Sequence, residues 1–296
     1  MASSLPATDG YRRTALTDLF SLKGKTVVVT GGARGLGLAF SWAVAEVGAN
    51  VAVLDLLDQP HDDFYLIEKE LGVKAKLYRV DVTDYEALEK AFDEVKKDFG
   101  SIDCWYGWPK ILIDERSTSH LTKSTVSSSV TSAGIGKDKP FLEHTQADMK
   151  SLLAINVEGS FFAAQFAAKH MKEQGTGGSI VMIASIAAHG SVPGKSVSGY
   201  CFTKGAILAG CRALADELTP YKIRVNTISP GYILTDMTIN NIATRPTILQ
   251  DLPKNIPMGH IGDRRDLKGA VVLLLSEASA YTTGSDVIID GGMIAH

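Results

Sequence analysis

Residues 25–37 read Lys-Thr-Val-Val-Val-Thr-Gly-Gly-Ala-Arg-Gly-Leu-Gly. The β-branched run at 25–30 is typical of a buried parallel strand, and the residues that follow the glycines have the pattern of a helix. Gly31, Gly35 and Gly37 would let the backbone turn tightly and approach a pyrophosphate, whose charge a helix N-terminus favours. The spacing departs from the usual Gly-x-Gly-x-x-Gly, and the alternative is a glycine-rich turn without a ligand. A strand before the glycines and a helix after them favour the phosphate-binding interpretation.

Strands and helices alternate along most of the 296 residues. Further strands are predicted at 50–55, 74–80, 101–104, 178–184, 223–228 and 286–290, and helices at 84–99, 148–174, 198–218 and 264–276. This alternation predicts the α/β class: a single doubly wound Rossmann domain over 22–292, with a central parallel sheet of about seven strands. An N-terminal arm, 1–21, precedes it. Binding sites are expected at the carboxyl ends of the strands.

The alternation fails between residues 105 and 129, where no sustained period is found and the end is rich in Ser and Thr. A long irregular insertion within a βαβ array is unusual for a compact domain. A second irregular stretch, 233–262, is a candidate lid over a substrate.

Asp55 ends the second predicted strand, roughly 20 residues after the glycines, where a carboxylate can accept hydrogen bonds from an adenosine ribose. The same carboxylate would repel a 2′-phosphate, so NAD is expected to be preferred to NADP. Arg34 acts in the opposite direction, because a guanidinium could bind that phosphate, and NADP stays an alternative. Asp55 could instead only cap the turn that follows it.

Tyr200 and Lys204 lie on one face of the predicted helix 198–218, one turn apart. A neighbouring ammonium favours phenolate over phenol, so the tyrosine pKa is expected to fall towards neutrality. Such a tyrosine can exchange a proton with an alcohol or carbonyl oxygen. A Tyr-x-x-x-Lys pair alone is more often an ordinary pair of surface neighbours, and its interpretation depends on the rest of the chain.

Composition excludes several classes of protein. A net charge of −3 gives no electrostatic reason to expect nucleic acid or an anionic membrane as a partner. Three cysteines do not form a disulfide framework, and a cytoplasmic location is expected. No apolar run is long enough to span a membrane, and no His/Cys cluster has the spacing of metal ligands.

Together these motifs resemble the short-chain dehydrogenase/reductase family. The resemblance runs from about Leu22 to Gly292, apart from the stretch at 105–129. It rests on motifs found in family order: Thr30-Gly31-x-x-x-Gly35-x-Gly37, Asp81, Ala133-Gly134, Asn156, Ser185, Tyr200-x-x-x-Lys204 and Pro230-Gly231. The segments Leu19–Lys25 and Pro230–Ile233 look most like the fungal sugar-alcohol branch, such as arabinitol dehydrogenases and sorbose reductases. Ser132 stands where the family usually has Asn, and a serine can still form a local main-chain hydrogen bond.

The resemblance implies a role for each residue of the site. Tyr200 would be the general acid/base, Lys204 would lower its pKa and bind the nicotinamide ribose, and Ser185 would hydrogen-bond the substrate oxygen. Asn156 would hold a water in a proton relay. The remaining cofactor contacts would come from Gly31, Arg34, Gly35, Leu36, Gly37, Asp55, Asp81, Val82, Ala133, Gly134, Pro230, Gly231, Ile233 and Thr235. His189 is the only histidine expected near the substrate.

These residues predict an NAD(P)-dependent oxidoreductase that acts on a secondary alcohol or ketone, with a small polyol or sugar as the expected substrate. A ketoreductase of secondary metabolism is the alternative enzyme, and a catalytically impaired dinucleotide-binding protein is the alternative without catalysis. A homo-oligomer, with a tetramer expected, follows from small residues assigned to the outer faces of two helices: Ala163, Ala164, Ala209 and Gly210.

The family needs about six steps from Asp103 to Ala133, and this chain takes about thirty. Removing 106–129 restores the spacing. The possible codons also fit an intron. Those of Trp105-Tyr106-Gly107 can contain an intron start, and those of Leu121-Thr122 can resemble a branch-point signal. The codon of Ser129 can supply the terminal AG. We therefore favour a retained intron over a functional surface loop, and expect 105–129 to pack poorly and to contribute no catalytic residue.

Overall fold

The computed structural model describes residues 14–107, 138–192, 195–235 and 252–295. Nine strands occur within these ranges: β1 Thr26–Thr30, β2 Asn50–Asp55, β3 Ala75–Arg79, β4 Cys104–Gly107, β5 Gly178–Ile183, β6 Ile223–Pro230, β7 Ile233–Leu234, β8 Gly262–Asp263 and β9 Asp286–Ile289. The α-helices are α1 Leu16–Leu19, α2 Gly35–Glu46, α3 Asp63–Leu71, α4 Tyr85–Phe99, α5 Gln146–Leu153, α6 Gly159–Gln174, α7 Ser198–Leu218 and α10 Lys268–Leu275.

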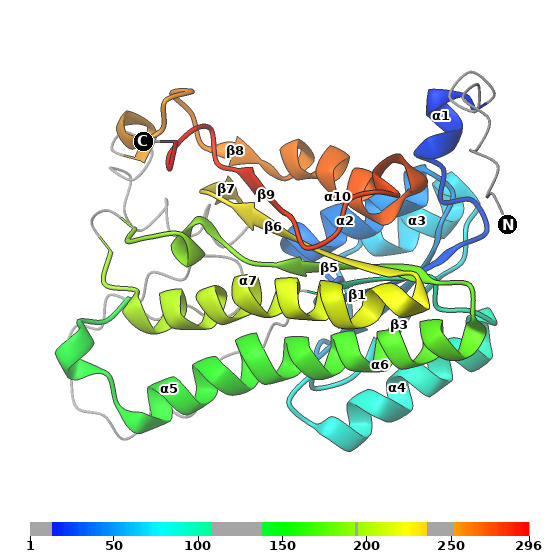
Figure 1. Ribbon diagram of the computed structural model, residues 1–296, viewed down its shortest axis with the longest axis horizontal. Helices are drawn as coiled ribbons and strands as arrows, with labels where there is room; N and C mark the ends of the chain where they lie inside the picture. Colours follow the sequence, from blue (N-terminus) through cyan, green and yellow to red (C-terminus); the bar gives the residue numbers. More distant parts are fainter. Residues whose placement is uncertain (1–13, 108–137, 193–194, 236–251, 296) are drawn as a thin grey trace, which may run out of the picture.

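One parallel sheet of seven strands forms the centre, in the order β3-β2-β1-β4-β5-β6-β9. Helices α2, α3 and α10 cover one face, and α4, α6 and α7 cover the other (Figure 1). The order reverses between β1 and β4, which is where a doubly wound sheet opens a crevice for a ligand. The predicted fold class is therefore confirmed.

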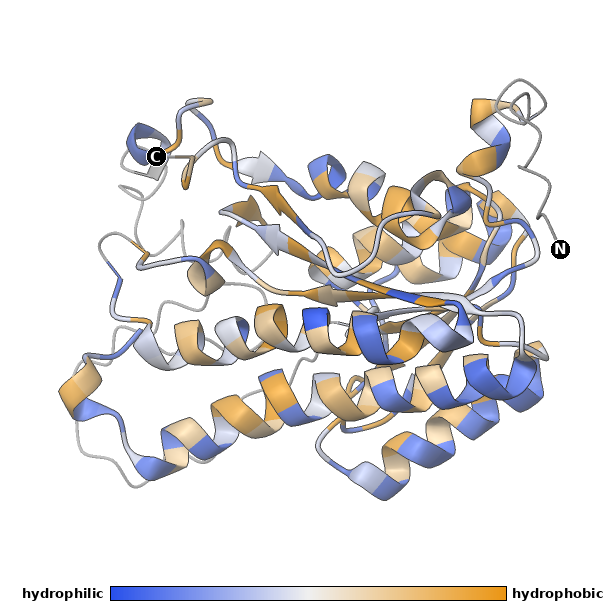
Figure 2. Cartoon of the chain, in the orientation of Figure 1, coloured by the Kyte–Doolittle hydropathy of each residue, from blue (hydrophilic) through white to orange (hydrophobic). Residues whose placement is uncertain are grey.

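The sheet is buried on both faces, because the side chains of successive strand residues pack alternately into two separate hydrophobic cores. Val27 and Val29 pack beneath α2 and α10, whereas Val28 packs towards α4 and α6. All five residues of β1 are buried, as the β-branched run predicts. Figure 2 shows this arrangement, with hydrophobic colour along the strands and hydrophilic colour on the outward parts of α4.

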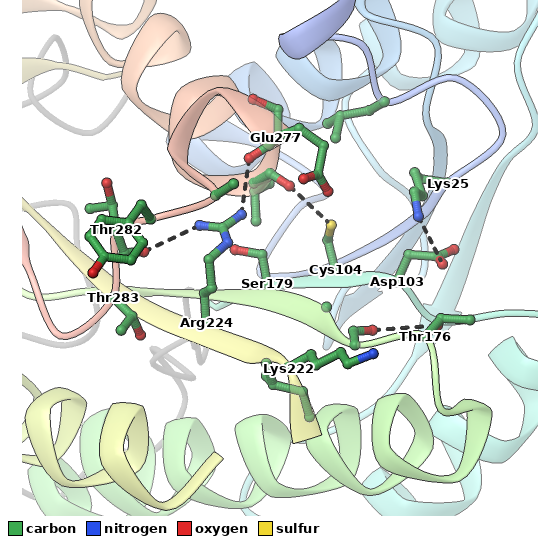
Figure 3. Close-up of a pocket in the computed structure, with 18 of the residues that line it drawn as sticks. Lys25, Asp103, Cys104, Thr176, Ser179, Lys222, Arg224, Glu277, Thr282 and Thr283 are labelled. Atoms are coloured by element: carbon green, nitrogen blue, oxygen red, sulfur yellow. Dashed lines mark hydrogen bonds and ion pairs between the residues drawn. The ribbon is translucent and has the colours of Figure 1, made fainter. Parts of the chain in front are cut away.

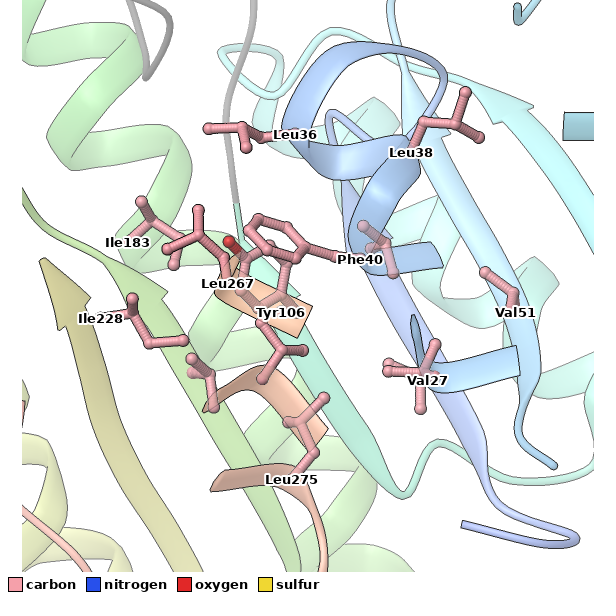
Figure 4. Close-up of a cluster of buried hydrophobic side chains, with 14 of the residues drawn as sticks. Val27, Leu36, Leu38, Phe40, Val51, Tyr106, Ile183, Ile228, Leu267 and Leu275 are labelled. Carbon is pink, nitrogen blue, oxygen red and sulfur yellow. The ribbon is translucent and has the colours of Figure 1, made fainter. Parts of the chain in front are cut away.

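The fourth strand differs from the prediction. It does not end at Cys104 but continues through Trp105, Tyr106 and Gly107, which are buried and paired with β1 and β5. Tyr106 lies among Phe40, Leu267 and their neighbours, with its ring centroid 4.5 Å from that of Phe40 (Figure 4). The expectation of poor packing is thus wrong for 105–107, because two aromatic rings provide apolar surface on both faces. Residues 108–129 lie outside the described ranges.

Other boundaries also differ. Helix α3 was not predicted, and the expected helix at 148–174 begins at Gln146 and is divided by a π-helical turn, Ala154–Glu158. Within the expected irregular stretch 233–262, β7 pairs with β8. Short 3₁₀ turns complete the described chain: Phe141–Glu143, Ile186–Ala188 (η5), Thr219–Tyr221, Leu252–Asn255, Arg264–Leu267 and Glu277–Ser279.

Candidate active site

The glycine loop connects β1 to α2 with backbone geometry that requires glycine. Gly31 and Gly35 have φ angles of 73° and 60°, in the left-handed region. A Cβ atom on Gly37 would collide with the main-chain oxygen of Gly31. The loop therefore folds closely against the first turn of α2, whose N–H groups are available to an anion.

Arg34 and Leu36 flank Gly35 and have different environments. The Nε atom of Arg34 is buried and has no hydrogen-bond partner among the described residues. A buried guanidinium nitrogen without an acceptor is costly, and a phosphate oxygen would satisfy it. The Leu36 side chain belongs to the core, so only its main chain could contact a cofactor. The loop therefore fits a dinucleotide phosphate.

Asp55 ends β2 with its carboxylate directed at the glycine loop. The side chain is buried and accepts hydrogen bonds from the amides of Ala33 at 3.1 Å and Leu57 at 3.2 Å. Asp55 thus does cap the turn that follows it. The same hydrogen bonds hold its carboxyl group at the carboxyl end of β2. Contact with a ribose stays a prediction.

Asp81 and Val82 follow β3 at the same edge of the sheet. Asp81 Oδ1 accepts hydrogen bonds from the amide and the hydroxyl of Thr83, at 2.9 and 2.8 Å. Val82 is buried against Gly159, where an added Cβ would approach Val82 Cγ2 to 2.8 Å. Both residues follow the carboxyl end of β3, and their contact with adenine stays a prediction.

Tyr200 and Lys204 lie one turn apart on α7, and both side chains are buried. Lys204 Nζ donates a hydrogen bond of 2.8 Å to the main-chain oxygen of Ile183, at the end of β5. The same nitrogen lies 5.6 Å from the ring centroid of Tyr200. The pair is therefore not a set of exposed helix neighbours but part of the interior at the carboxyl edge of the sheet.

Burial decides the protonation of both groups. Burial raises the pKa of Tyr200, and a hydrogen bond with Ser185 partly opposes it. Burial also lowers the pKa of Lys204 to about 7. The predicted fall of the tyrosine pKa towards neutrality is therefore wrong for the protein alone, because desolvation raises the pKa and outweighs the hydrogen bond with Ser185.

Ser185 follows β5 and begins η5. Its Oγ accepts a hydrogen bond of 3.2 Å from the amide of Ala187 and is close enough to Tyr200 to affect the pKa of that phenol. The structure therefore brings together the two hydroxyl groups predicted to meet one substrate oxygen.

Asn156 lies in the π-helical turn between α5 and α6 and is fully buried. Its Nδ2 donates a hydrogen bond of 3.0 Å to Thr203 Oγ1, and Thr203 Oγ1 donates one of 2.8 Å to the main-chain oxygen of Tyr200. π-helical turns are often found at functional sites. Thr203 is a supporting residue that sequence reasoning missed, since only its place beside Lys204 could have suggested it.

The segment after β6 reaches the same edge. Gly231 donates its amide to the oxygen of Ile289 at 2.9 Å, and an added Cβ would approach the Asp290 Cβ to 2.7 Å. Ile233 and Thr235 are buried behind it. Ala133 and Gly134 lie outside the described residues.

A cavity of about 630 Å³ lies at the opposite, amino-terminal end of the strands (Figure 3). Its Arg224 already donates hydrogen bonds to the main-chain oxygens of Leu274, Ser276 and Thr282. Because these polar groups support the fold and the predicted site lies at the other end, this cavity is not the candidate active site.

The described residues include no helix with the length and apolar character of a membrane span. They also include no group of three His, Cys, Asp or Glu side chains placed to hold a metal ion.

Comparisons with known proteins agree with this geometry. A family model described as "short chain dehydrogenase" matches residues 25–108, and one described as "Enoyl-(Acyl carrier protein) reductase" matches residues 117–294. The chain belongs to the short-chain dehydrogenase/reductase family. It is therefore an oxidoreductase of the class that transfers a hydride between a nicotinamide cofactor and an alcohol or carbonyl carbon.

Among members of this family, the NADP-dependent mannitol dehydrogenase of Hypocrea jecorina is 35% identical, over 94% of this chain and 95% of that protein. The sorbose reductase of Schizosaccharomyces pombe is 32% identical, over 94% and 98%. A gluconate 5-dehydrogenase from Burkholderia cenocepacia, solved in complex with NADP and tartrate, has a TM-score of 0.80 and 26% identity, over 95% of this chain and all of that chain (100%). The predicted likeness to sugar-alcohol members of the family is confirmed.

Proposed function

We propose that this short-chain dehydrogenase/reductase interconverts a secondary alcohol and a ketone of a small polyol or sugar. The observation that carries the proposal is the buried grouping of Ser185, Tyr200, Lys204 and Asn156 beside a glycine loop shaped for a dinucleotide. The names of the relatives support the substrate class. A nicotinamide dinucleotide, when bound, supplies or accepts the hydride.

The chain's own residues would supply the proton and place the substrate. The raised pKa keeps the Tyr200 phenol protonated, so it can donate to a carbonyl oxygen during reduction. Ser185 would hydrogen-bond the same oxygen and stabilise charge that develops on it. Lys204 and Asn156, joined through Thr203 and the main chain of α7, would hold Tyr200 and return its proton from solvent.

We propose that NAD(H) is preferred to NADP(H). Asp55 places a buried carboxylate at the end of β2, where a 2′-phosphate would meet like charge. The NADP-dependent relatives and the buried Arg34 Nε favour the opposite preference. Titration of both reduced cofactors decides between them, because tighter binding of NADPH would show that Arg34 dominates.

A substrate panel of polyols, sugars and other ketones, followed by NADH or NADPH absorbance, tests the activity. Turnover of a polyol or ketose supports the proposal, and turnover only of bulky ketones would indicate a ketoreductase instead. Cofactor binding with no turnover on any of them would indicate a catalytically impaired dinucleotide-binding protein.

We further propose a homo-oligomer, a tetramer, in the cytoplasm. Phe161 on α6 and Phe202 on α7 are 45% and 69% exposed, and Ala209, further along α7, is exposed. Apolar side chains on neighbouring helices suit a two-fold interface. Ala163 and Ala164, assigned to this face from the sequence, instead pack in the core. The three free cysteines suit a reducing compartment.

We also propose that residues 106–129 are encoded by a retained intron, and that the shorter chain, with Cys at position 105, is the active form. Trp105 Nε1 and Tyr106 Oη are buried without hydrogen-bond partners among the described residues. A Cβ on Gly107 would collide with the Trp105 ring. In the shorter chain Cys, Val130 and Thr131 would occupy these three positions, which removes both unpaired polar groups and, with the Trp105 ring gone, leaves room for the Cβ of Thr131.

A further inference from the structure

A partly buried polar cluster, exposed at His189, lies beyond η5 and is not used by the proposed reaction. His189 Nε2 lies 2.8 Å from Asp286 Oδ2 and 3.2 Å from Ser229 Oγ. Ser229 Oγ donates a hydrogen bond of 3.0 Å to Asp286 Oδ1. The Asp286 side chain is 10% exposed, and that of His189 is 24% exposed. The three side chains therefore contact one another, with Ser229 buried, Asp286 nearly so and His189 at the surface.

This cluster joins three segments that the chain order separates. His189 directly follows η5, the turn that Ser185 begins. Ser229 lies in β6 directly before Pro230-Gly231, and Asp286 is the first residue of β9. A carboxylate that receives both an imidazole N–H and a hydroxyl holds its partners firmly. The segment after Ser185 is therefore attached to the sheet at both of its ends.

We infer that His189 is a positioning residue, which fixes Ser185 relative to Tyr200 by anchoring η5 to Asp286 and Ser229. The inference rests on the proposed function, since it assigns Ser185 to the substrate oxygen. Helix α7, strand β6 and an apolar cluster around Ile186 also contact η5, so the His189 anchor is a polar part of a larger set of contacts that hold this turn. Catalytic groups must keep their geometry to within a fraction of an ångström to be effective.

Glutamine gives a matched control, because its Nε2 can donate to Asp286 from nearly the position of the imidazole Nε2. His189→Ala removes the donor, and Asp286→Asn keeps the shape of its partner while removing the charge. His189 is expected near the substrate, but none of these side chains is assigned to the cofactor. The cofactor dissociation constant is therefore expected to stay within about twofold of the original value in all three variants.

The test compares the kcat and KM of the full chain and its variants for a turned-over substrate. His189→Ala should lower kcat at least tenfold with less effect on KM, and His189→Gln should restore kcat to within about threefold. A kcat in His189→Ala within twofold of the original value would overturn the inference, as would an equal loss in His189→Ala and His189→Gln.

Hydrogen exchange separates this inference from the proposed function. Amides of 186–189 should exchange faster in His189→Ala and Asp286→Asn but not in His189→Gln, whether or not a substrate is known. Unchanged exchange in His189→Ala would overturn the anchor even if the enzyme is active. An original chain that turns over no alcohol or ketone would overturn the proposed function, while exchange would still report on the anchor.

Discussion

Lys204 Nζ lies 5.6 Å from the ring centroid of Tyr200 and donates a hydrogen bond to the main-chain oxygen of Ile183, at the end of β5. The lysine thus connects the helix that carries the phenol to the sheet that carries Ser185. A side chain in this position orders the site as well as charging it. The two residues can therefore be tested separately. Tyr200 is tested by its effect on turnover, and Lys204 by its effect on how stability depends on pH.

Tyr200→Phe should lower kcat by about 10²–10⁴-fold, the usual contribution of a general acid or base. The phenyl ring keeps the packing, so the dissociation constant of the cofactor should change little. Steady-state kinetics and fluorescence titration of reduced cofactor measure the two effects. Turnover close to that of the original protein would rule out the proposed mechanism.

Lys204→Met should change how stability depends on pH. Burial lowers the pKa of Lys204 from 10.5 to about 7, so the unfolded chain binds more protons than the folded one between these values. The stability of the original protein should rise with pH across this window, by up to about 1.4 kcal/mol per pH unit from this group, and should not respond to it below pH 7.

Denaturant unfolding of both proteins at several pH values between 7 and 9.5 measures this difference. The Lys204→Met variant is expected to lack this rise in stability with pH. Any excess of its unfolding free energy over that of the original protein should therefore shrink as pH increases. If the difference in unfolding free energy between the two proteins does not vary with pH, the pKa of Lys204 is not lowered in the folded protein.

Asp55→Ser should narrow any preference for NAD, because it removes the carboxylate that opposes a 2′-phosphate. It also removes an acceptor for the Ala33 and Leu57 amides, so a small loss of affinity for both cofactors is expected. Asp62→Ser is the matched control, since that aspartate is exposed at the start of α3. If the ratio of the dissociation constants for NADH and NADPH is the same in Asp55→Ser as in the original protein, Asp55 does not determine the cofactor preference.

Light scattering at micromolar concentration should give the mass of a homo-oligomer. Phe202→Glu should reduce the mass, because it puts a charge on the apolar face of α7, and Lys222→Glu, on the exposed αL turn after α7, should not. A monomeric mass for the original chain would refute the assembly.

The chain with residues 106–129 deleted and Trp105→Cys should unfold at higher denaturant concentration than the full chain. Each buried polar group left without a partner costs about 1–3 kcal/mol, and the shorter strand has neither. It should also have the higher kcat. Sequencing of mature transcripts is the independent check: if all of them retain these codons, the intron interpretation fails.

Much of this architecture could be predicted from local pattern. The strand at 50–55 and the helix at 198–218 have the expected bounds, because β-branched runs and helical spacing are properties of neighbouring residues. The π-helical turn at Asn156 could not be predicted, since its stability depends on tertiary contacts such as the one with Thr203. The direction of the Tyr200 pKa was missed for a similar reason: spacing on a helix shows which charge is near but not how much water is excluded.

The contact between His189 and Asp286 spans 97 positions of the chain and has a consequence for biosynthesis. Among the strands of the described sheet, β9 is synthesised after the others, so β6 stays at the edge of the sheet until residues 286–289 are available to pair with it. A nascent chain therefore completes its glycine loop first, and the neighbourhood of Ser185 is complete only once β9 has been synthesised. A chain that ends shortly before Asp286 would contain the glycine loop but lack both β9 and the contact that anchors η5 through His189.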